Sequence, residues 1–297
     1  MVNFDLLKCM CMLMIVGIHF YTHGLFADLG NYQEVDMNMF GSYDRSVRSV
    51  NFLLSEYAFI VFCISVNCFV LITGYFMARS RLKVNRIVGI WVQTLFYSIA
   101  IPCIMWFFIG DAARPYLLKG LTPVSSNIYW FVTIYIGLMM MSPFLILLVN
   151  KMEKAIFKQF LLMFGLINIT FIWKIPWGDV YGGGTSLLFF MFLFCMGGYI
   201  RIFGIKRGKG HYGKYFFLLS LLLFVWTLTL DFSVGVRHHT GPYHVINRYN
   251  GFLFFLSVLA FLWVKDMKMD NRILFDIVTK ISPYVFGVYL ITQNPEI

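Results

Sequence analysis

Charged residues are scarce in this chain of 297 residues: they make up 13% of it, whereas 60% of the residues are hydrophobic. Soluble domains average ~25% charged and about 45–50% apolar residues. The composition therefore excludes an ordinary soluble enzyme and predicts a protein that crosses a membrane several times. The first apolar stretch opens with Asp5 and Lys8 and lacks a small-residue cleavage motif, so we interpret it as a retained span and not a signal peptide.

The sequence also lacks the motifs of several catalytic and metal sites. Its six cysteines all fall in apolar stretches and show no paired spacing in a polar loop, which predicts neither a disulfide framework nor a zinc site. The glycine run at 182–184 is not followed by the Lys-Ser/Thr of a phosphate-binding loop, and no Ser-centred elbow motif is evident. We therefore expect buried thiols and no metal cofactor.

Nine apolar segments are candidates to cross a bilayer. They lie at 4–26, 57–78, 87–109, 128–149, 157–173, 186–203, 214–230, 250–264 and 281–297. The fifth, eighth and ninth are short for a span of ~20 residues, and the ninth runs into the end of the chain. We predict an all-α fold, a polytopic transmembrane helix bundle of about nine spans with a truncated last helix, forming one domain over 1–297.

Lysine and arginine are distributed unequally between the predicted loops. Seventeen of the 24 fall on one side of the membrane, counting Lys8 and the loops at 79–86, 151–158, 201–214 and 265–280. The positive-inside rule therefore places the N-terminus and these loops in the cytoplasm. This asymmetry accounts for most of the net charge of +10. Nucleic-acid binding would need a basic soluble module that bears aromatic residues, and the sequence contains none.

The first apolar segment carries an ionisable residue well inside the bilayer. Lys8 and His19 are eleven residues apart, so they share one helix face about 16 Å apart along the axis, and Asp5 and His23 lie near the same line. An ionisable side chain at such depth is costly and is by default a functional candidate. A neutral imidazole can take a proton from a hydroxyl. The alternative is a histidine that only forms a hydrogen bond between helices.

A second cluster of charge, with Arg79, Arg81, Lys83 and Arg86, follows the second segment and opens the third. Several cations within a short stretch can bind phosphate groups through charge-assisted hydrogen bonds, and arginine can do so bidentately. The alternative is a stop-transfer cluster that meets anionic lipid headgroups. The sequence by itself leaves both interpretations open.

Five sequence stretches together carry a family resemblance. They are FDLLKCMCMLMIVGIHF at 4–20, NCFVLITGYFM at 67–77, YWFVTIYIGLMMMSPFL at 129–145, YNGFLFFLSVLAFL at 249–262 and SPYVFGVYLITQNP at 282–295. In this order and spacing the chain resembles the acyltransferase-3 family of bacterial integral-membrane O-acyltransferases, in particular its polysaccharide O-acetyltransferase branch. The resemblance implies transfer of an acetyl group from cytoplasmic acetyl-CoA to a hydroxyl of a cell-surface or exported polysaccharide, in the bacterial cytoplasmic membrane.

The resemblance also implies roles for four residues. His19 matches the family's essential histidine and would act as general base. Lys8 matches its basic partner, which is more often arginine, and Lys83 and Arg86 match a basic pair that is more often two arginines. By this likeness the three cations would bind acetyl-CoA, which is the acyl donor, and the acceptor would be a glycan.

The chain departs from the family pattern at its C-terminal end. Thr292 stands where members of this branch commonly have a histidine, and the chain stops at Ile297 where relatives continue. A catalytically impaired, truncated member of the family is therefore one alternative, as is a non-catalytic subunit of a glycan assembly complex. A transporter or flippase for lipid-linked glycans is another, but that class is typically built from internal repeats, and the sequence shows no clear repeat.

Overall fold

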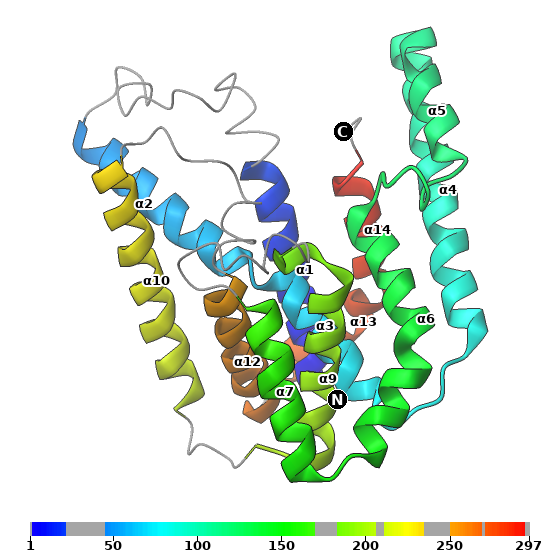
Figure 1. Cartoon of the computed structure of the whole chain (residues 1–297). Helices are drawn as coiled ribbons and strands as arrows, with labels where there is room; N and C mark the ends of the chain where they lie inside the picture. The colour runs from blue at the N-terminus through cyan, green and yellow to red at the C-terminus, as the bar shows by residue number, and fades with distance from the viewer. Residues whose placement is uncertain are drawn as a thin grey trace. The chain divides into compact units, whose positions relative to one another are not determined.

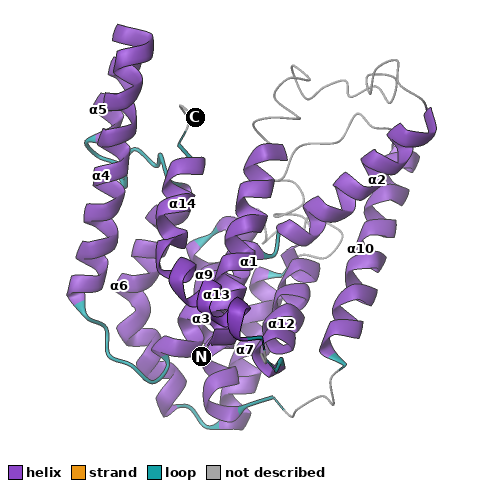
Figure 2. Cartoon of the chain, turned by 180° about the vertical axis from the view of Figure 1, so that it is seen from behind, coloured by secondary structure: helices purple, strands orange, loops and turns teal. Residues whose placement is uncertain are grey.

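The computed structural model describes residues 2–21, 45–169, 183–205, 211–234, 250–268 and 271–294, and all regular structure in these ranges is helical (Figures 1 and 2). The α-helices are α1 (Val2–His19), α2 (Arg45–Phe62), α3 (Ser65–Met77), α4 (Val84–Ile109), α5 (Arg114–Gly120), α6 (Trp130–Lys151), α7 (Lys154–Asn168), α9 (Leu187–Phe203), α10 (Tyr212–Val234), α12 (Asn250–Asp266), α13 (Arg272–Ile281) and α14 (Val285–Thr292). Three short 3-10 helices are η2 (Gly110–Ala113), η3 (Gly183–Thr185) and η5 (Ser282–Tyr284).

The described helices are apolar enough to make this a multi-pass membrane protein. Six stretches have the length and hydropathy of a membrane span: Val2–His19, Leu53–Met77, Val84–Gly120, Trp130–Lys151, Tyr212–Thr229 and Arg272–Thr292. Helix α9 is a shorter apolar helix, and α7 and α12 cover the two remaining predicted segments. Each predicted segment thus coincides with one or two helices, and the polytopic all-α bundle is confirmed.

The chain forms two compact units, each built from three stretches of sequence. Unit 1 contains Met1–Phe69, Ile167–Gly184 and Lys206–Val278, and unit 2 contains Val70–Leu166, Thr185–Ile205 and Thr279–Ile297. The single domain expected over 1–297 stays a prediction.

In unit 1, α1 packs against α2 and α12, and α10 packs against α2 and α12. Figure 1 shows α2 and α10 side by side. The rings of Phe4 and Phe261 join α1 to α12 with their centroids 5.3 Å apart. Van der Waals contact between closely fitting side chains stabilises this packing, because in a bilayer the hydrophobic effect does not favour helix–helix over helix–lipid contact.

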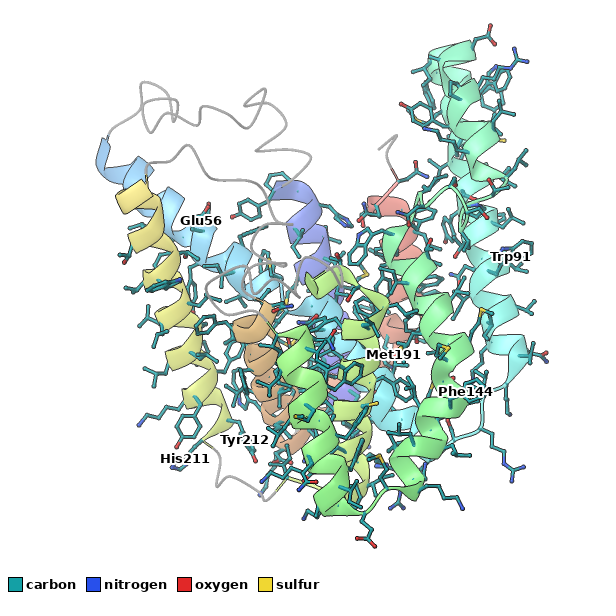
Figure 3. The ribbon with its side chains drawn as sticks, in the orientation of Figure 1. Glu56, Trp91, Phe144, Met191, His211 and Tyr212 are labelled. Atoms are coloured by element: carbon teal, nitrogen blue, oxygen red, sulfur yellow. The ribbon has the colours of Figure 1, made fainter. Side chains whose placement is uncertain are left out.

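In unit 2, α6 packs against α9, and α4 packs against α5, α6 and α14. The outward sides of α4 and α6 carry large apolar side chains, including Trp91, which is 44% exposed, and Phe144, which is 69% exposed (Figure 3). Such exposure would be a liability in water, but it suits contact with lipid chains. The helices thus present apolar surface for the membrane, and the polar side chains of Thr94, Ser98 and Ser142 are among the residues that they bury.

One helical hairpin in unit 2 was not predicted. The sequence indicated a loop after the third apolar segment, but the chain turns at Gly110, whose φ is 59°, and returns as α5 beside α4. The Ser98 hydroxyl donates to the carbonyl oxygen of Gly120 at 2.7 Å, which joins the two arms. Glycine adopts this positive φ without the steric cost that a side chain would add.

Candidate functional site

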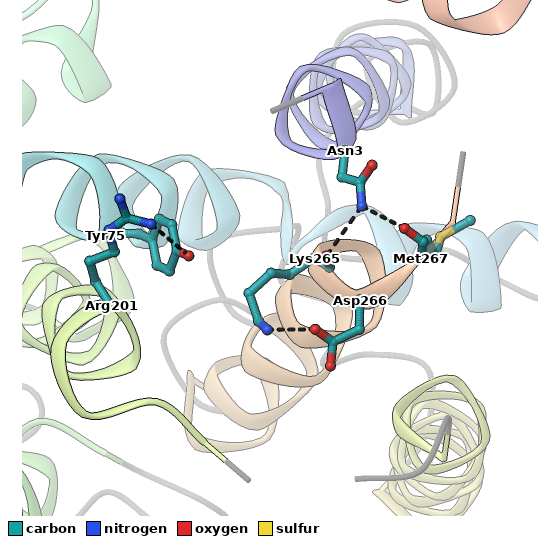
Figure 4. A network of polar contacts seen from close by, with 6 residues as sticks. All are labelled: Asn3, Tyr75, Arg201, Lys265, Asp266 and Met267. Carbon is teal, nitrogen blue, oxygen red and sulfur yellow. Dashed lines mark hydrogen bonds and ion pairs between the residues drawn. The ribbon is translucent and has the colours of Figure 1, made fainter. Parts of the chain in front are cut away.

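Helix α1 is held against its neighbours in unit 1 near both ends. The Asn3 amide donates to the carbonyl oxygens of Lys265, at 3.2 Å, and Met267, at 2.7 Å, at the end of α12 (Figure 4). Near the other end, a Cβ added to Gly17 would lie 2.5 Å from the ring of Phe62 in α2. These contacts leave α1 little freedom to rotate, so the direction in which each of its faces points is well defined.

The face of α1 that carries Lys8 and His19 is the inward one. Cys11 and Ile15 are buried, whereas Leu13 on the opposite side is 73% exposed. Lys8 and His19 lie within about 40° of Ile15 around the helix axis. Both are half-buried. The imidazole therefore belongs to the protein-facing side of the helix, and the lipid-facing side is the one with Leu13.

His19 is the last residue of α1 in regular α-helical geometry. Phe20 and Tyr21 continue as a π-helical turn, and the ring of Tyr21 lies edge-on to Phe59 of α2 with centroids 6.0 Å apart. Local π-helical geometry is rare and often occurs at functional positions. The remainder of the predicted segment, with His23, lies outside the described residues.

Lys8 forms an ion pair with a carboxylate on its own helix. Its Nζ is 3.0 Å from Oδ1 of Asp5, three residues earlier, and the two side chains are 32% and 25% exposed. At this exposure the pair contributes only ~0–1 kcal/mol to stability. The sequence placed both residues near one line without indicating that they pair. The pairing means that part of the Lys8 charge is already balanced inside the protein.

Lys83 and Arg86 lie at the N-terminus of α4 in unit 2. Lys83 is the N-cap residue and its side chain makes no capping hydrogen bond, and both residues are exposed. Among the described residues, neither Lys83 nor Arg86 takes part in an ion pair with a carboxylate. A helix N-terminus favours anions because its N–H groups and the helix dipole present positive charge there. This end of α4 is therefore suited to a phosphate group.

The Thr73-Gly74-Tyr75 triplet in α3 contacts two other helices of unit 2. The hydroxyls of Thr73 and Tyr135 are 3.0 Å apart, which joins α3 to α6. The Tyr75 hydroxyl accepts a hydrogen bond at 3.1 Å from Nη1 of Arg201, in the last turn of α9. The triplet thus joins α3 to α6 through Thr73 and to Arg201 of α9 through Tyr75.

Sequence reasoning missed a buried carboxylate. Glu56 immediately precedes the predicted segment 57–78, but α2 begins at Arg45, so Glu56 lies within the helix and is only 7% exposed (Figure 3). It is one turn before Phe59, which contacts the end of α1. The signal was present in the apolar run LLSEYAFIVF, because a carboxylate inside such a run is a functional candidate by default. Glu56 therefore joins the residues of interest in unit 1.

Other features of the described residues do not suggest a reaction centre. No group of three or more His, Cys, Asp and Glu residues in the described ranges could hold a metal ion. An open hollow of about 320 Å³ in unit 1 is lined by Leu53, Leu54, Tyr57, Leu221 and Phe224. Its lining surface is apolar, and it includes none of the predicted site residues. Its lining contains no charged residue and no histidine.

The four predicted site residues thus divide between the units. Lys8 and His19 share the inward face of α1 in unit 1, and Lys83 and Arg86 share the start of α4 in unit 2. The tertiary structure adds two candidate functional residues that the sequence did not indicate, Arg201 and Glu56.

Comparison with protein families gives one match. The acyltransferase-3 model, described as an acyltransferase domain, matches residues 1–293 and so runs through both units. No curated protein matches the chain, and no solved structure does.

Proposed function

Since the chain belongs to the acyltransferase-3 family and is a membrane acyltransferase, we propose that it moves an acetyl group from cytoplasmic acetyl-CoA to a hydroxyl of a cell-surface or exported polysaccharide. The observation that carries this proposal is the position of His19 on the inward face of α1. The family match supports acyl transfer as the reaction. The acetyl donor and the polysaccharide acceptor follow from the sequence resemblance to the O-acetyltransferase branch.

In the proposed reaction His19 is the general base. Its neutral imidazole accepts the proton of a sugar hydroxyl as the hydroxyl oxygen attacks the thioester carbonyl carbon. The carbon–sulfur bond then breaks, and the leaving CoA sulfur takes the proton back from the imidazolium. General-base assistance of this kind contributes typically about 10²–10⁴-fold in rate. The half-buried ring of His19 on the inward face of α1 supports this role.

The acyl donor would be bound through its phosphates. Lys83 and Arg86 offer charge at the N-terminus of α4, where the helix dipole adds to it. The bias of lysine and arginine towards one set of loops supports a cytoplasmic location for this end of α4, where acetyl-CoA is available. Lys8 would add a further cation on α1, weakened by its ion pair with Asp5.

The test is transfer of labelled acetyl groups by membranes that contain the full chain. Wild-type membranes incubated with radiolabelled acetyl-CoA and host polysaccharide should yield labelled, base-sensitive glycan. His19→Ala should abolish labelling while the protein inserts at normal levels. His211→Ala is the matched control, because His211 is an exposed histidine at the start of α10, and it should leave labelling unchanged.

The other functions predict different results in this assay. A flippase for lipid-linked glycans would give no labelled glycan but would move the glycan across vesicle membranes. An impaired family member would give neither signal, and Thr292→His would then be the first substitution to test for recovery. Near-wild-type labelling by the His19→Ala protein would refute the role given to this residue while leaving acyl transfer intact.

A further inference from the structure

Arg201 is held in a defined position at the end of α9 that faces α3 in unit 2. Its Nη1 donates to the Tyr75 hydroxyl at 3.1 Å, and its Cζ lies 4.8 Å from the centroid of the same ring (Figure 4). The ring contact is a cation–π interaction, which constrains the plane of the guanidinium. Tyr75 is a neutral partner, so it orients the arginine without balancing its charge. Most of the N–H donors of the guanidinium remain available to a ligand.

Close helix packing explains why the two side chains meet. A Cβ added to Gly197 of α9 would lie 2.3 Å from the carbonyl oxygen of Leu71 in α3. Arg201 follows Gly197 by four residues, and Tyr75 follows Leu71 by four residues. Each therefore lies about one helical turn beyond this backbone contact. The backbone contact sets the distance between the helices, and the side chains meet next to it.

A purely structural explanation of Arg201 is that the helix dipole and the positive-inside rule favour a cation in the last turn of a helix. That explanation requires only a positive charge, which a freely solvated lysine would supply equally well. It does not account for a guanidinium held on an aromatic ring. Nor is the charge balanced, because among the described residues no carboxylate forms an ion pair with Arg201. A pre-oriented, unbalanced guanidinium is the usual arrangement for binding a phosphate.

The same turn of α3 also contacts α6. Thr73, two residues before Tyr75, has its hydroxyl 3.0 Å from the Tyr135 hydroxyl. Two residues of a helix are about 3 Å apart along its axis. One turn of α3 therefore contacts Arg201 of α9 through Tyr75 and is anchored to α6 through Thr73, which fixes the place at which the guanidinium is held.

We infer that Arg201 is a further phosphate-binding residue for the acyl donor, acting in unit 2 together with Lys83 and Arg86. The inference rests on the proposed function, in which the donor is acetyl-CoA. CoA carries a diphosphate and a 3′-phosphate, so its nucleotide end requires several cations and gains from arginines that bind phosphates bidentately. The proposal adds a residue from α9 to a pair that the sequence placed on α4 alone.

The experiment measures equilibrium binding of CoA to the purified full chain in detergent, together with KM and kcat for acetyl-CoA. Arg201→Gln should weaken CoA binding about tenfold, which corresponds to ~1.4 kcal/mol. It should raise KM for acetyl-CoA by a similar factor with little change in kcat, since only binding of the donor is lost. Adenosine 3′,5′-bisphosphate, which lacks the thiol arm, should show the same loss. Arg201→Lys should recover part of the affinity because it restores the charge but not the planar fork.

Two further variants make the result decisive. Tyr75→Phe keeps the ring but removes the hydrogen bond to Arg201, and we expect roughly a threefold loss of CoA affinity. Arg272→Gln removes one positive charge from an exposed arginine at the start of α13, and it should leave CoA binding unchanged. If Arg201→Gln is too unstable to purify, Tyr75→Phe and Arg201→Lys carry the test.

The binding measurements distinguish a missing role of Arg201 from a missing donor site. Wild-type affinity of both Arg201→Gln and Tyr75→Phe, with weakened binding by Lys83→Gln and Arg86→Gln, would overturn the role of Arg201 and keep the donor site. If Arg201→Gln and Arg272→Gln lost CoA affinity equally, the loss would be an effect of net charge alone. That result would also overturn the role of Arg201. If the wild-type protein binds no CoA at all, the proposed function itself fails.

Discussion

Gly74 of α3 and Phe194 of α9 approach so closely that a Cβ on Gly74 would lie 2.1 Å from the carbonyl oxygen of Phe194 and 2.7 Å from its Cα. Both atoms belong to a helix backbone, which cannot move aside as a flexible side chain can. The glycine between Thr73 and Tyr75 is therefore required for the separation of α3 and α9. The contacts of its two neighbours with Tyr135 and Arg201 depend on that separation.

Gly74→Ala should destabilise the protein by about 1–3 kcal/mol, the usual range for overpacking in a dense interior. The measurement is thermal or denaturant unfolding of the purified chain in detergent. Gly89→Ala in α4 is the matched control, since a Cβ there meets no atom within 4 Å. That control should be neutral or slightly stabilising, because alanine is the better helix former. Equal stability of the two variants would contradict the close packing.

Tyr129→Phe should also destabilise unit 2. The buried amide of Asn294 donates to the Tyr129 hydroxyl at 3.0 Å, and the tyrosine is fully buried. Loss of the acceptor leaves that bond unmade, at a cost of about 1–3 kcal/mol. Tyr284→Phe is the control, because Tyr284 is 72% exposed, and its unfolding midpoint should match that of the wild type. No difference between the two midpoints would exclude a stabilising role for the Asn294–Tyr129 bond.

Asp5→Asn should strengthen donor binding if Lys8 contacts the acetyl-CoA phosphates as proposed. The Asp5 carboxylate balances the Lys8 charge at 3.0 Å, so its removal frees that charge for an anion. We expect KM for acetyl-CoA to fall about two- to threefold for Asp5→Asn and to rise for Lys8→Gln. Stability should change little because the pair is partly exposed. Asp111→Asn is the control, because it removes a negative charge from exposed η2, and it should leave KM for acetyl-CoA unchanged. If KM is the same in all these variants, Lys8 does not bind the donor.

The predicted orientation can be checked with two cysteine substitutions in unit 2. Arg81 in the α3–α4 link and Lys119 in α5 are both exposed. They lie beyond opposite ends of α4 in the sequence. Cys9 and Cys103 are first replaced, because the other four thiols are buried and should not react. A membrane-impermeant maleimide should label Arg81→Cys only in inside-out vesicles and Lys119→Cys only in intact cells. The reverse pattern would invert the topology and separate the Lys83–Arg86 pair from cytoplasmic acetyl-CoA.

Local patterns in the sequence predicted much of this architecture. The apolar segments coincide with helices because a helix satisfies its own backbone hydrogen bonds, so segment composition is sufficient to identify it. The shared face of Lys8 and His19 follows in the same way from the helical repeat. Both are properties of one segment considered alone.

Contacts between segments that are distant in the sequence could not be predicted from the sequence. Helix α5 returns beside α4, where the Ser98 hydroxyl donates a hydrogen bond to the carbonyl oxygen of Gly120. The start of α2 at Arg45 moved Glu56 from a predicted loop into the interior. The hydrogen bond between Arg201 and Tyr75 joins residues 126 positions apart. No local pattern reports such a pair, because the helices can pack in several ways that bury similar apolar area.

The sequence by itself thus determined the all-helical membrane class, the family and the spacing of Lys8 and His19 along α1. The tertiary structure decided which side of α1 faces inward, because Asn3 and Gly17 fix its rotation against α12 and α2. It also decided which arginine reaches α3, since glycines allow α9 to approach at backbone distance. The physical reason is that hydropathy identifies a helix, whereas its rotation and its partners are set by steric fit between particular side chains and backbones.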